Sequence, residues 1–435
     1  MKFYSTSNKN IQVSFEEAVR QGMAMDGGLF VPETIDQLPK NFWRNFSQKS
    51  FNQISFEVAS HFLKGSLPEE DLKKIIQHSL VVDAPLVKVE STIFALELFH
   101  GPTLAFKDFG ARFLAEVLGY YIARKQEEIT VLVATSGDTG SAVAHGFFNL
   151  PGIKVVVLYP SGKVSESQEK QFTTLGGNVT ALEVAGTFDD CQRMVKQAFS
   201  DVEIRQRRTL TSANSINVAR LLPQMFYYFR AFQQIPLPQQ KLVIAVPSGN
   251  FGNLTAGLWA KKMGLSVDRF VAATNVNNVV PEYLRTQIFR PIHSKMTISN
   301  AMDVGDPSNF QRMMGLYNFD HASLTNDVSG YEFTDDETVE AIREVYRTFK
   351  YIMDPHGAVG YLGLKKYLAN SLFPATGIFL ETAHPAKFKE TVEKSITTSI
   401  QLPECLLNLM SKKKKSILMK KDFKELKEYL LKEIN

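Results

Sequence analysis

Strand-like and helix-like segments alternate along this chain, and the alternation restricts the fold more than any other feature of the sequence. Residues 129–135 are mostly apolar and β-branched, residues 140–148 suit a helix, and residues 154–159 are again apolar and β-branched. Strand candidates elsewhere have a similar composition: residues 94–99, 241–247, 270–274 and 376–383. Such strands, separated by helices, are typical of parallel sheets covered on both faces. The sequence therefore predicts an α/β protein.

The chain has 435 residues, which suggests about two or three domains. Residues 1–85 come before the alternation and are expected to be mostly helical, with Ser14 and Glu17 placed to form a capping box at a helix start. The rest divides into a smaller α/β region at 86–225, a larger one at 226–400 and a lysine-rich tail at 401–435.

The composition is that of a soluble globular protein. Hydrophobic residues make up 44% of the chain and charged residues 22%, and no apolar run approaches the length of a membrane span. The first residues lack an apolar signal region. The two cysteines, Cys191 and Cys405, have no metal-like spacing and fit a reducing compartment. We therefore expect a cytoplasmic protein with no membrane partner and no metal site.

The net charge of +4 originates in the tail. Residues 411–435 hold nine lysines and four acidic residues, whereas the rest of the chain holds 40 basic and 41 acidic residues. The run at 412–415 could contact nucleic acid. A solvated stretch before a short amphipathic helix is the favoured interpretation, so no nucleic-acid partner is expected. The apolar side of that helix would comprise Leu418, Phe423, Leu426, Leu430 and Leu431.

Lys107 is the strongest candidate for chemistry. It follows a Gly-Pro turn and stands between Phe106 and Phe109. Apolar surroundings disfavour an ammonium ion and lower its pKa, and a neutral amine is what a nucleophile or a Schiff base needs. The same pattern also fits a lysine whose stem covers apolar neighbours while its head stays in water. This segment alone leaves both interpretations open.

Polar turns follow three of the expected strands, at residues 134–140, 248–253 and 381–385. Ligands of open parallel sheets bind beyond the carboxyl ends of the strands. The first two turns place glycines and hydroxyl or amide side chains directly before a helix, which is how phosphate sites are built. Neither is a Walker A loop or a dinucleotide fingerprint, and each taken singly also fits an ordinary strand-to-helix turn.

Arg220 follows Asn214, Ser215 and Asn217, a setting that suits a clamp for a carboxylate or a phosphate. A structural arginine at a helix start explains it equally well. The histidines form no metal-ligand pattern, and the sequence suggests no Ser-His-Asp arrangement.

Taken together, the segments resemble the threonine synthase family, which are pyridoxal-phosphate enzymes of fold type II. The resemblance is to the bacterial and fungal branch, which carries an N-terminal helical segment. It covers the chain to about residue 390 and depends on five stretches: residues 26–33 (DGGLFVPE), 100–108 (HGPTLAFKD), 134–142 (ATSGDTGSA), 246–253 (VPSGNFGN) and 382–388 (TAHPAKF). It implies two open, mostly parallel sheets flanked by helices, with the cofactor lysine in the smaller region and the cofactor-phosphate turn in the larger one.

The resemblance also implies roles for individual residues. Lys107 would bind pyridoxal phosphate covalently and act as the acid and base of the reaction, Thr382 would face the pyridine nitrogen with its hydroxyl, and Asp138 would lie beside the cofactor ring. The cofactor phosphate would lie in a turn formed by Ser248, Gly249, Asn250, Phe251 and Asn253.

The implied substrate is O-phospho-L-homoserine, which is converted with water to L-threonine and phosphate. Its phosphate needs donors of its own. By resemblance these are Thr135, Ser136, Thr139, Asn214, Ser215 and Arg220, with Lys163 and Ser165 as an extension. The enzyme would be a monomer or a homodimer.

Two rivals remain at this point. Another fold-type-II lyase or dehydratase acting on a phosphorylated or hydroxy amino acid would share Lys107 and the cofactor turn, but not the substrate-phosphate set. A Ser-x-Lys-x-Asn/Arg motif or a His-Lys pair would favour that rival, and Phe106-Lys107-Asp108 matches neither. A binding protein that kept the fold without catalysis is the other; the presence of both Lys107 and Thr382 argues against it.

Overall fold

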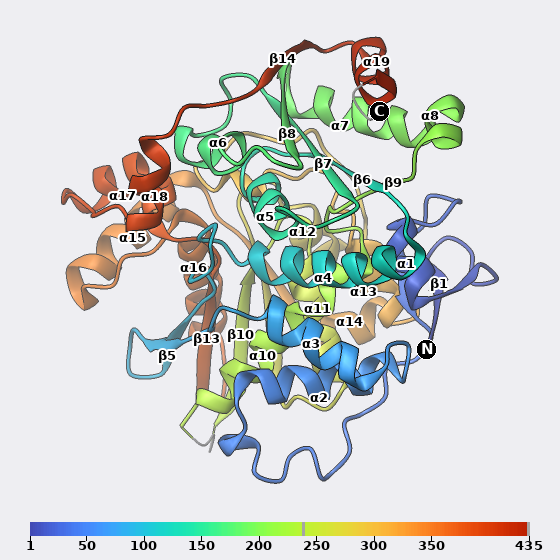
Figure 1. The fold of residues 1–435 in the computed structure, drawn as a ribbon. Helices are drawn as coiled ribbons and strands as arrows, with labels where there is room; N and C mark the ends of the chain where they lie inside the picture. Colours follow the sequence, from blue (N-terminus) through green and yellow to red (C-terminus); the bar gives the residue numbers. More distant parts are fainter. Residues whose placement is uncertain (237–239, 433–435) are drawn as a thin grey trace.

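The protein folds into two large sheets and one small sheet, with helices between and around them (Figure 1). The computed structural model describes residues 1–236 and 240–432. The alternation of strands and helices confirms the predicted α/β class, and all six predicted strands appear within one or two residues of their expected ends.

The first large sheet has six strands in the order β12-β11-β10-β13-β5-β4, all parallel except β4. Its strands are β4 (Leu86–Lys88), β5 (Ile93–Glu97), β10 (Lys241–Pro247), β11 (Arg269–Thr274), β12 (Val328–Glu332) and β13 (Ala375–Glu381). The helices that accompany it are α10 (Gln224–Gln234), α11 (Gly252–Lys262), α12 (Val279–Thr286), η2 (Asn300–Met302), α13 (Phe310–Leu316), α14 (His321–Asp327), α15 (Asp335–Phe349), α16 (Pro355–Ala369), η3 (Pro385–Phe388) and α17 (Lys389–Ile396).

The second large sheet has five parallel strands in the order β14-β8-β7-β6-β9. They are β6 (Ile129–Ala134), β7 (Ile153–Pro160), β8 (Val179–Ala185), β9 (Leu210–Thr211) and β14 (Ile417–Lys420). Every residue of β6 is buried, as expected for a strand covered on both faces. The helices of this part are α4 (Lys107–Lys125), α5 (Asp138–Gly146), α6 (Glu166–Thr173), α7 (Phe188–Ser200), α8 (Val202–Arg207), α9 (Val218–Leu221), α18 (Glu404–Met410) and α19 (Phe423–Lys432).

The N-terminal segment is less helical than predicted. It contains an antiparallel sheet of β1 (Lys2–Ser5), β2 (Gln12–Ser14) and β3 (Phe30–Pro32), besides α1 (Phe15–Gln21), η1 (Phe46–Gln48), α2 (Phe51–Leu63) and α3 (Glu69–Ser79). The capping box at α1 is confirmed: Glu17 N–H donates to the Ser14 hydroxyl and Ser14 N–H to the Glu17 carboxylate, at 3.2 and 2.8 Å. Strands this short carry little periodicity, which explains why the sequence did not reveal β1 and β2.

The sheets do not follow the segment boundaries proposed from sequence. β4 and β5, placed in the 86–225 region, pair with the sheet built from the 226–400 region, through the parallel pair β5–β13. β14, placed in the tail, extends the five-stranded sheet by pairing with β8. Pairing partners far apart in sequence set these boundaries, and a local pattern contains no information about them. The last three residues of the proposed tail lie outside the described residues.

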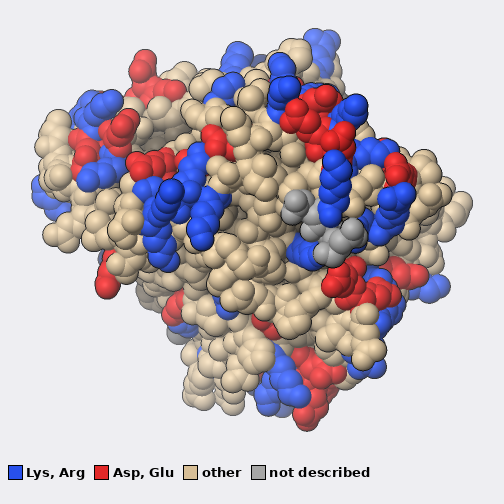
Figure 2. Space-filling view, turned by 45° about the horizontal axis from the view of Figure 1, so that its top comes forward, with Lys and Arg blue, Asp and Glu red and all other residues tan. Residues whose placement is uncertain are grey.

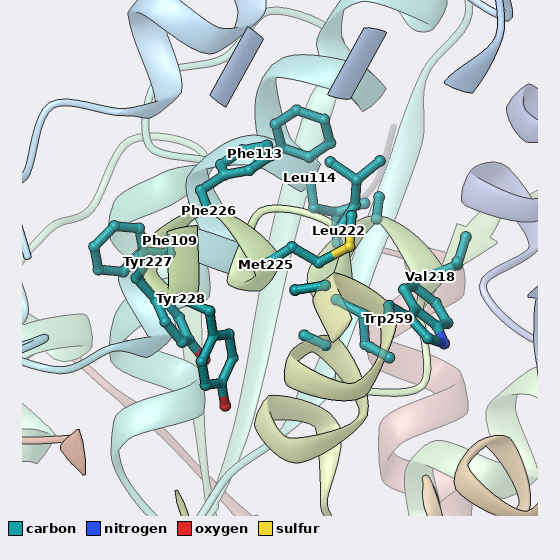
Figure 3. Packing of buried hydrophobic residues seen from close by; sticks show 14 of the residues in the cluster. Phe109, Phe113, Leu114, Val218, Leu222, Met225, Phe226, Tyr227, Tyr228 and Trp259 are labelled. Atoms are coloured by element: carbon teal, nitrogen blue, oxygen red, sulfur yellow. The ribbon is translucent and has the colours of Figure 1, made fainter. Parts of the chain in front are cut away.

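Helix α4 lies near the centre of the molecule and packs against α3, α5 and α9 (Figure 1). Figure 3 shows Phe109 and Phe113 of α4 against Tyr227 and Phe226 of α10, with ring centroids 5.5 and 6.2 Å apart in edge-on geometry. These rings are almost fully buried. Such packing fixes the axis of α4 and hence the position of its first residue, Lys107.

The lysine-rich tail is ordered against the five-stranded sheet. Lys414 forms ion pairs with Glu169 of α6 and Glu183 of β8, at 2.6 and 2.7 Å. The amphipathic helix predicted there is α19, which buries Leu426 and Leu430; Leu418, assigned to its apolar side, instead lies in β14 and is 72% exposed. On the face in Figure 2, acidic side chains border the basic ones. Within the described residues, no helix is long and apolar enough to cross a membrane.

Candidate active site

The loop before α4 is fastened to the end of β13. Phe106 N–H donates to the Thr382 carbonyl at 2.9 Å, and His384 N–H donates to the Leu104 carbonyl at 3.0 Å. Because Phe106 directly precedes Lys107, this pairing holds Lys107 beside the buried Thr382. Two residues that are 275 positions apart in sequence are thus brought together by the backbone itself.

Lys107 is largely buried, between the carboxylate of Asp138 and the ring of Phe106. Its side chain is 16% exposed, its Nζ is 3.6 Å from Asp138 Oδ2 and 5.8 Å from the centroid of the Phe106 ring. Burial lowers the pKa of Lys107; the charge of Asp138 opposes this shift, and the charges of Lys387 and Arg220 add to it. The amine is therefore easier to deprotonate than an ordinary lysine, which agrees with the first of the two interpretations that the sequence left open.

Asp138 is the first residue of α5, and its carboxylate is almost completely buried. Oδ1 forms an ion pair with Lys387 and accepts a hydrogen bond from Gln168 Nε2 at 2.9 Å, whereas Oδ2 faces Lys107. Burial alone would raise the pKa of Asp138, but the ammonium groups of Lys387 and Lys107 lower it below its ordinary value. Asp138 is therefore an anion within this site.

The turn after β10 is shaped by its own side chains. Asn253 Nδ2 donates to the Pro247 carbonyl at 2.8 Å, and the Ser248 hydroxyl donates to Asn253 Oδ1 at 3.1 Å. Asn250 Oδ1 accepts from Ser308 N–H at 3.2 Å, and Phe251 adopts the left-handed conformation that reverses the chain into α11. A Cβ on Gly249 would lie 2.8 Å from the Met302 Cα, so only glycine fits there.

This turn opens α11, which has no acidic residue in its first turn. The amino end of a helix carries partial positive charge and unpaired N–H groups. β10 and β13 are neighbouring parallel strands, so the turn and Thr382 lie at the same edge of the sheet. The predicted anion turn and the predicted lysine site are therefore adjacent.

The turn after β6 uses Thr135 to order itself. The Thr135 hydroxyl accepts from Gly137 and Gly140 N–H, at 3.0 and 2.8 Å. Ser136 and Thr139 are partly exposed, and their hydroxyls form no hydrogen bond with other described residues. Of these three predicted donors, Thr135 is occupied within the turn and the other two have free hydroxyls.

Arg220 approaches the start of α4 from α9. A Cβ on Gly110 would lie 2.7 Å from the Arg220 carbonyl oxygen and 2.8 Å from its Nε. Arg220 Nη1 donates to the Ala213 carbonyl, while Arg220 Nε and Asn214 Oδ1 are buried without a partner among the described residues. Burial lowers the pKa of Arg220 to about 10. A buried cation with an open donor is what a clamp for an anion requires.

Ser215 lies next to Asn214 in the loop before α9, and two side chains hold its backbone in place. Its carbonyl accepts from Arg312 Nη1 at 3.3 Å and from Asn309 Nδ2 at 3.4 Å. Arg312 also binds the Phe30 carbonyl of β3, so this arginine ties the 213–217 loop to the N-terminal segment.

Lys163 and Ser165 lie farther out, on the exposed turn between β7 and α6. Lys163 forms no ion pair within the described residues. The Ser165 hydroxyl caps α6 and bonds Gln168 Oε1 at 2.9 Å. Ser165 is connected to the site through Gln168 and Asp138, whereas Lys163 is not.

Two residues of the site escaped the sequence reasoning. Lys387 lies in the stretch 382–388 that supports the family resemblance, but we inferred no role for it. Its position between Ala386 and Phe388 is the same apolar setting that singled out Lys107. Gln168 carries no signal in the sequence, because an amide in a polar helix is usually a surface residue.

Chemically, the site combines the Lys107 amine, which loses its proton easily, with two groups of donors that suit an anion. These are the turn after β10 and the surroundings of Arg220. Comparisons with known proteins agree with this description. Residues 79–378 match the family described as pyridoxal-phosphate dependent enzyme, residues 2–80 match threonine synthase N terminus, and residues 357–430 match threonine synthase, C-terminal.

Individual relatives extend over the whole chain. The threonine synthase of Haemophilus influenzae is 47% identical and covers 99% of this chain and 100% of the relative. The structure of threonine synthase from Escherichia coli has a TM-score of 0.91 and 43% identity over 100% of both chains. The PLP-bound threonine synthase from Brucella melitensis has a TM-score of 0.92 and 33% identity, over 99% of this chain and 98% of that one. The predicted family is confirmed: the chain belongs to the threonine synthases, within the pyridoxal-phosphate dependent enzymes.

Proposed function

We propose that the protein converts O-phospho-L-homoserine and water to L-threonine and phosphate, as a threonine synthase with pyridoxal phosphate as its cofactor. The observation that carries the proposal is the buried Lys107 amine, which is held beside Thr382 by the hydrogen bond from Phe106 to the Thr382 carbonyl. Family membership and this geometry support the same reaction.

The residues present fit the cofactor. Lys107 has a pKa lowered by burial, so its amine is available for a covalent bond to an aldehyde. The turn from Ser248 to Asn253 opens a helix that has no first-turn acid, which suits the cofactor phosphate. Thr382 offers a neutral hydroxyl near Lys107, which would not hold a proton on the pyridine nitrogen as a carboxylate would.

Bound pyridoxal phosphate would supply an electron sink for negative charge at Cα and Cβ of the amino acid. Lys107 would take one proton from Cα and one from Cβ, and would return protons at Cα and at Cγ, which becomes the methyl group of L-threonine. Phosphate leaves from Cγ and water adds at Cβ. The lowered pKa of Lys107 keeps part of the amine neutral, and therefore basic, near neutral pH.

The substrate phosphate is assigned to the second anion place. Arg220 Nε, near the start of α4, and the hydroxyls of Ser136 and Thr139, near the start of α5, are donors without a hydrogen-bond partner among the described residues. Thr135 orders the turn that carries two of them, and Arg312 holds the loop that carries Ser215. Asn214 Oδ1 is an acceptor and does not itself suit the phosphate, but the Nδ2 of the same amide is a donor that does.

The cysteines and the tail bear on the location and the partners of the protein. The exposed Cys405 and the buried Cys191 are both unpaired, which suits the reducing cytoplasm. The tail lysine Lys414 is engaged by two carboxylates, so it is not free to bind a nucleic acid. We assign the protein as a cytoplasmic monomer or homodimer that acts on a small molecule.

Reduction of the purified protein with borohydride tests the cofactor assignment. Peptide mass spectrometry should find the cofactor attached at Lys107, and the Lys107→Ala variant should lose the visible absorbance of the bound cofactor. Lys170→Ala is a suitable control, because Lys170 is also a partly buried lysine but contacts Glu166 and the Met410 carbonyl instead. Unchanged absorbance in Lys107→Ala would overturn the assignment.

A further inference from the structure

A second lysine, Lys387, is completely buried behind the first. Its side chain has no exposure, its Nζ donates to the Thr103 carbonyl at 2.8 Å, and it forms an ion pair with Asp138 Oδ1. The short helix η3 directs it inward: the His384 ring caps that helix by accepting from Ala386 N–H at 3.1 Å. A buried ammonium ion is costly unless it is paired, so its retention calls for an explanation.

Lys387 and Lys107 share one carboxylate. Lys387 and Gln168 both bind Oδ1 of Asp138, whereas Lys107 is 3.6 Å from Oδ2. The closer and more buried of the two ammonium groups is thus Lys387. Asp138 is therefore already neutralised when Lys107 approaches it, and its attraction for a proton on Lys107 is reduced.

A further cation acts on Lys107 in the same direction as Lys387. Arg220 lowers the pKa of Lys107 from the side of α9. Asp108 is held by Thr103, with its Oδ1 accepting from the hydroxyl at 2.7 Å and its Oδ2 from the N–H at 2.9 Å; burial raises the pKa of Asp108 to about 6. His145, which lies within reach of the charge of Lys387, is uncharged near neutral pH because burial lowers its pKa to about 4. Asp138 is thus the group that favours a protonated Lys107. Lys387 is the principal positive charge that offsets the carboxylate of Asp138.

We propose that Lys387 is a positioning residue that binds the carboxylate of Asp138 and thereby keeps the released amine of Lys107 neutral, so that it can act as the base. The inference rests on the proposed function, for which Lys107 must take a proton from the substrate. Without Lys387, the whole charge of Asp138 would act on Lys107 and hold it as an ammonium ion.

Lys387 is not itself assigned to the substrate. Its side chain is completely buried, and its two contacts, with Thr103 and Asp138, are both within the chain. It acts through Asp138, which distinguishes it from Arg220, whose Nε has no partner among the described residues.

The test measures the proton affinity of Lys107 directly. In the full chain freed of cofactor, acetic anhydride labels the neutral amine, and peptide mass spectrometry follows the labelling of Lys107 as a function of pH. Lys387→Met should raise the apparent pKa of Lys107 by about one unit, so that roughly tenfold less amine is neutral at a given pH below it. The low-pH limb of kcat in the holoenzyme should move in the same direction.

Two further variants separate this role from a merely structural one. Asp138→Asn should lower the pKa of Lys107, and Asp138→Asn with Lys387→Met should bring it back toward the value of the wild type, because both partners of the pair are then removed. Lys387→Arg should retain most of the wild-type value. Lys170→Met is the matched control and should change nothing.

A Lys107 pKa that is the same in Lys387→Met and in the wild type would overturn the inference. If Lys387→Met does not fold, an unchanged pKa in Asp138→Asn would overturn it equally. The labelling needs no turnover, so it is independent of the reaction. A wild type that forms no threonine contradicts the proposed function, whereas an active wild type with no shift in the variants contradicts the role of Lys387 alone.

Discussion

Replacing Arg220 with methionine should separate substrate binding from stability. Arg220 is buried, yet among the described residues its Nε has no partner and only its Nη1 is engaged, by the Ala213 carbonyl. A charge-assisted hydrogen bond contributes about 1.5–3 kcal/mol. With one or two such bonds to the substrate phosphate, Arg220→Met should lose about 2–4 kcal/mol of transition-state stabilisation, which is roughly a 30- to 900-fold fall in kcat/KM.

Arg220→Met should leave the stability of the folded protein nearly unchanged. An incompletely paired buried charge is costly, and methionine fills a similar space without that cost. We therefore expect the free energy of unfolding without substrate to stay within about 1 kcal/mol of the wild type. Arg220→Lys, which keeps the charge but not the planar group, should recover part of kcat/KM.

Arg312 is the matched control, because it is equally buried but fully engaged. It donates to the carbonyls of Phe30, Ser215 and Ile216 and to Asn309 Oδ1. Arg312→Met leaves these acceptors without a donor and should cost at least about 3 kcal/mol of unfolding free energy. Steady-state kinetics and urea unfolding of both variants check the contrast. If Arg220→Met unfolds easily and retains its kcat/KM, Arg220 is a structural residue and the reasoning is refuted.

Other predictions concern pH and the tail. Burial lowers the pKa of His145 to about 4, from an ordinary 6.5; the unfolded chain therefore takes up a proton that the folded one does not, and unfolding free energy should fall as pH drops from 6.5 to 4. Urea unfolding of His145→Gln should show a smaller fall; an equal fall would count against this. A chain ending at residue 410 should unfold at lower urea concentration, because it loses β14 and the buried Leu426 and Leu430. If the shortened chain has the same urea midpoint as the full chain but no longer binds RNA, the tail is instead a nucleic-acid-binding segment.

Long apolar strands and capped helices were the parts of the fold that the sequence revealed. Residues 241–247 form β10 with the predicted bounds, and the Ser14 capping box is present. Both are local features, since periodicity and end signals lie within a few residues of each other. β14 was missed because three of its four residues are exposed and it follows the lysine run, so neither composition nor alternation distinguishes it.

The candidate site also has residues that local sequence patterns revealed and contacts that they did not. Lys107, the turn at Ser248 and Thr382 stood out because each follows a recognisable strand or lies in an unusual setting. The contact between Thr382 and Phe106 depends on the pairing of β13 with β5, which joins distant segments. The Lys387–Asp138 ion pair joins a residue of η3 to the first residue of α5, and no local sequence pattern predicts a contact between segments so far apart.

Incubation of the purified protein with O-phospho-L-homoserine tests the central claim most directly, with phosphate and threonine measured in the same sample. The account predicts equal amounts of both products, dependent on Lys107. Phosphate released without threonine would show a lyase that does not add water at Cβ. The absence of both products would contradict the assigned substrate and the proposed function.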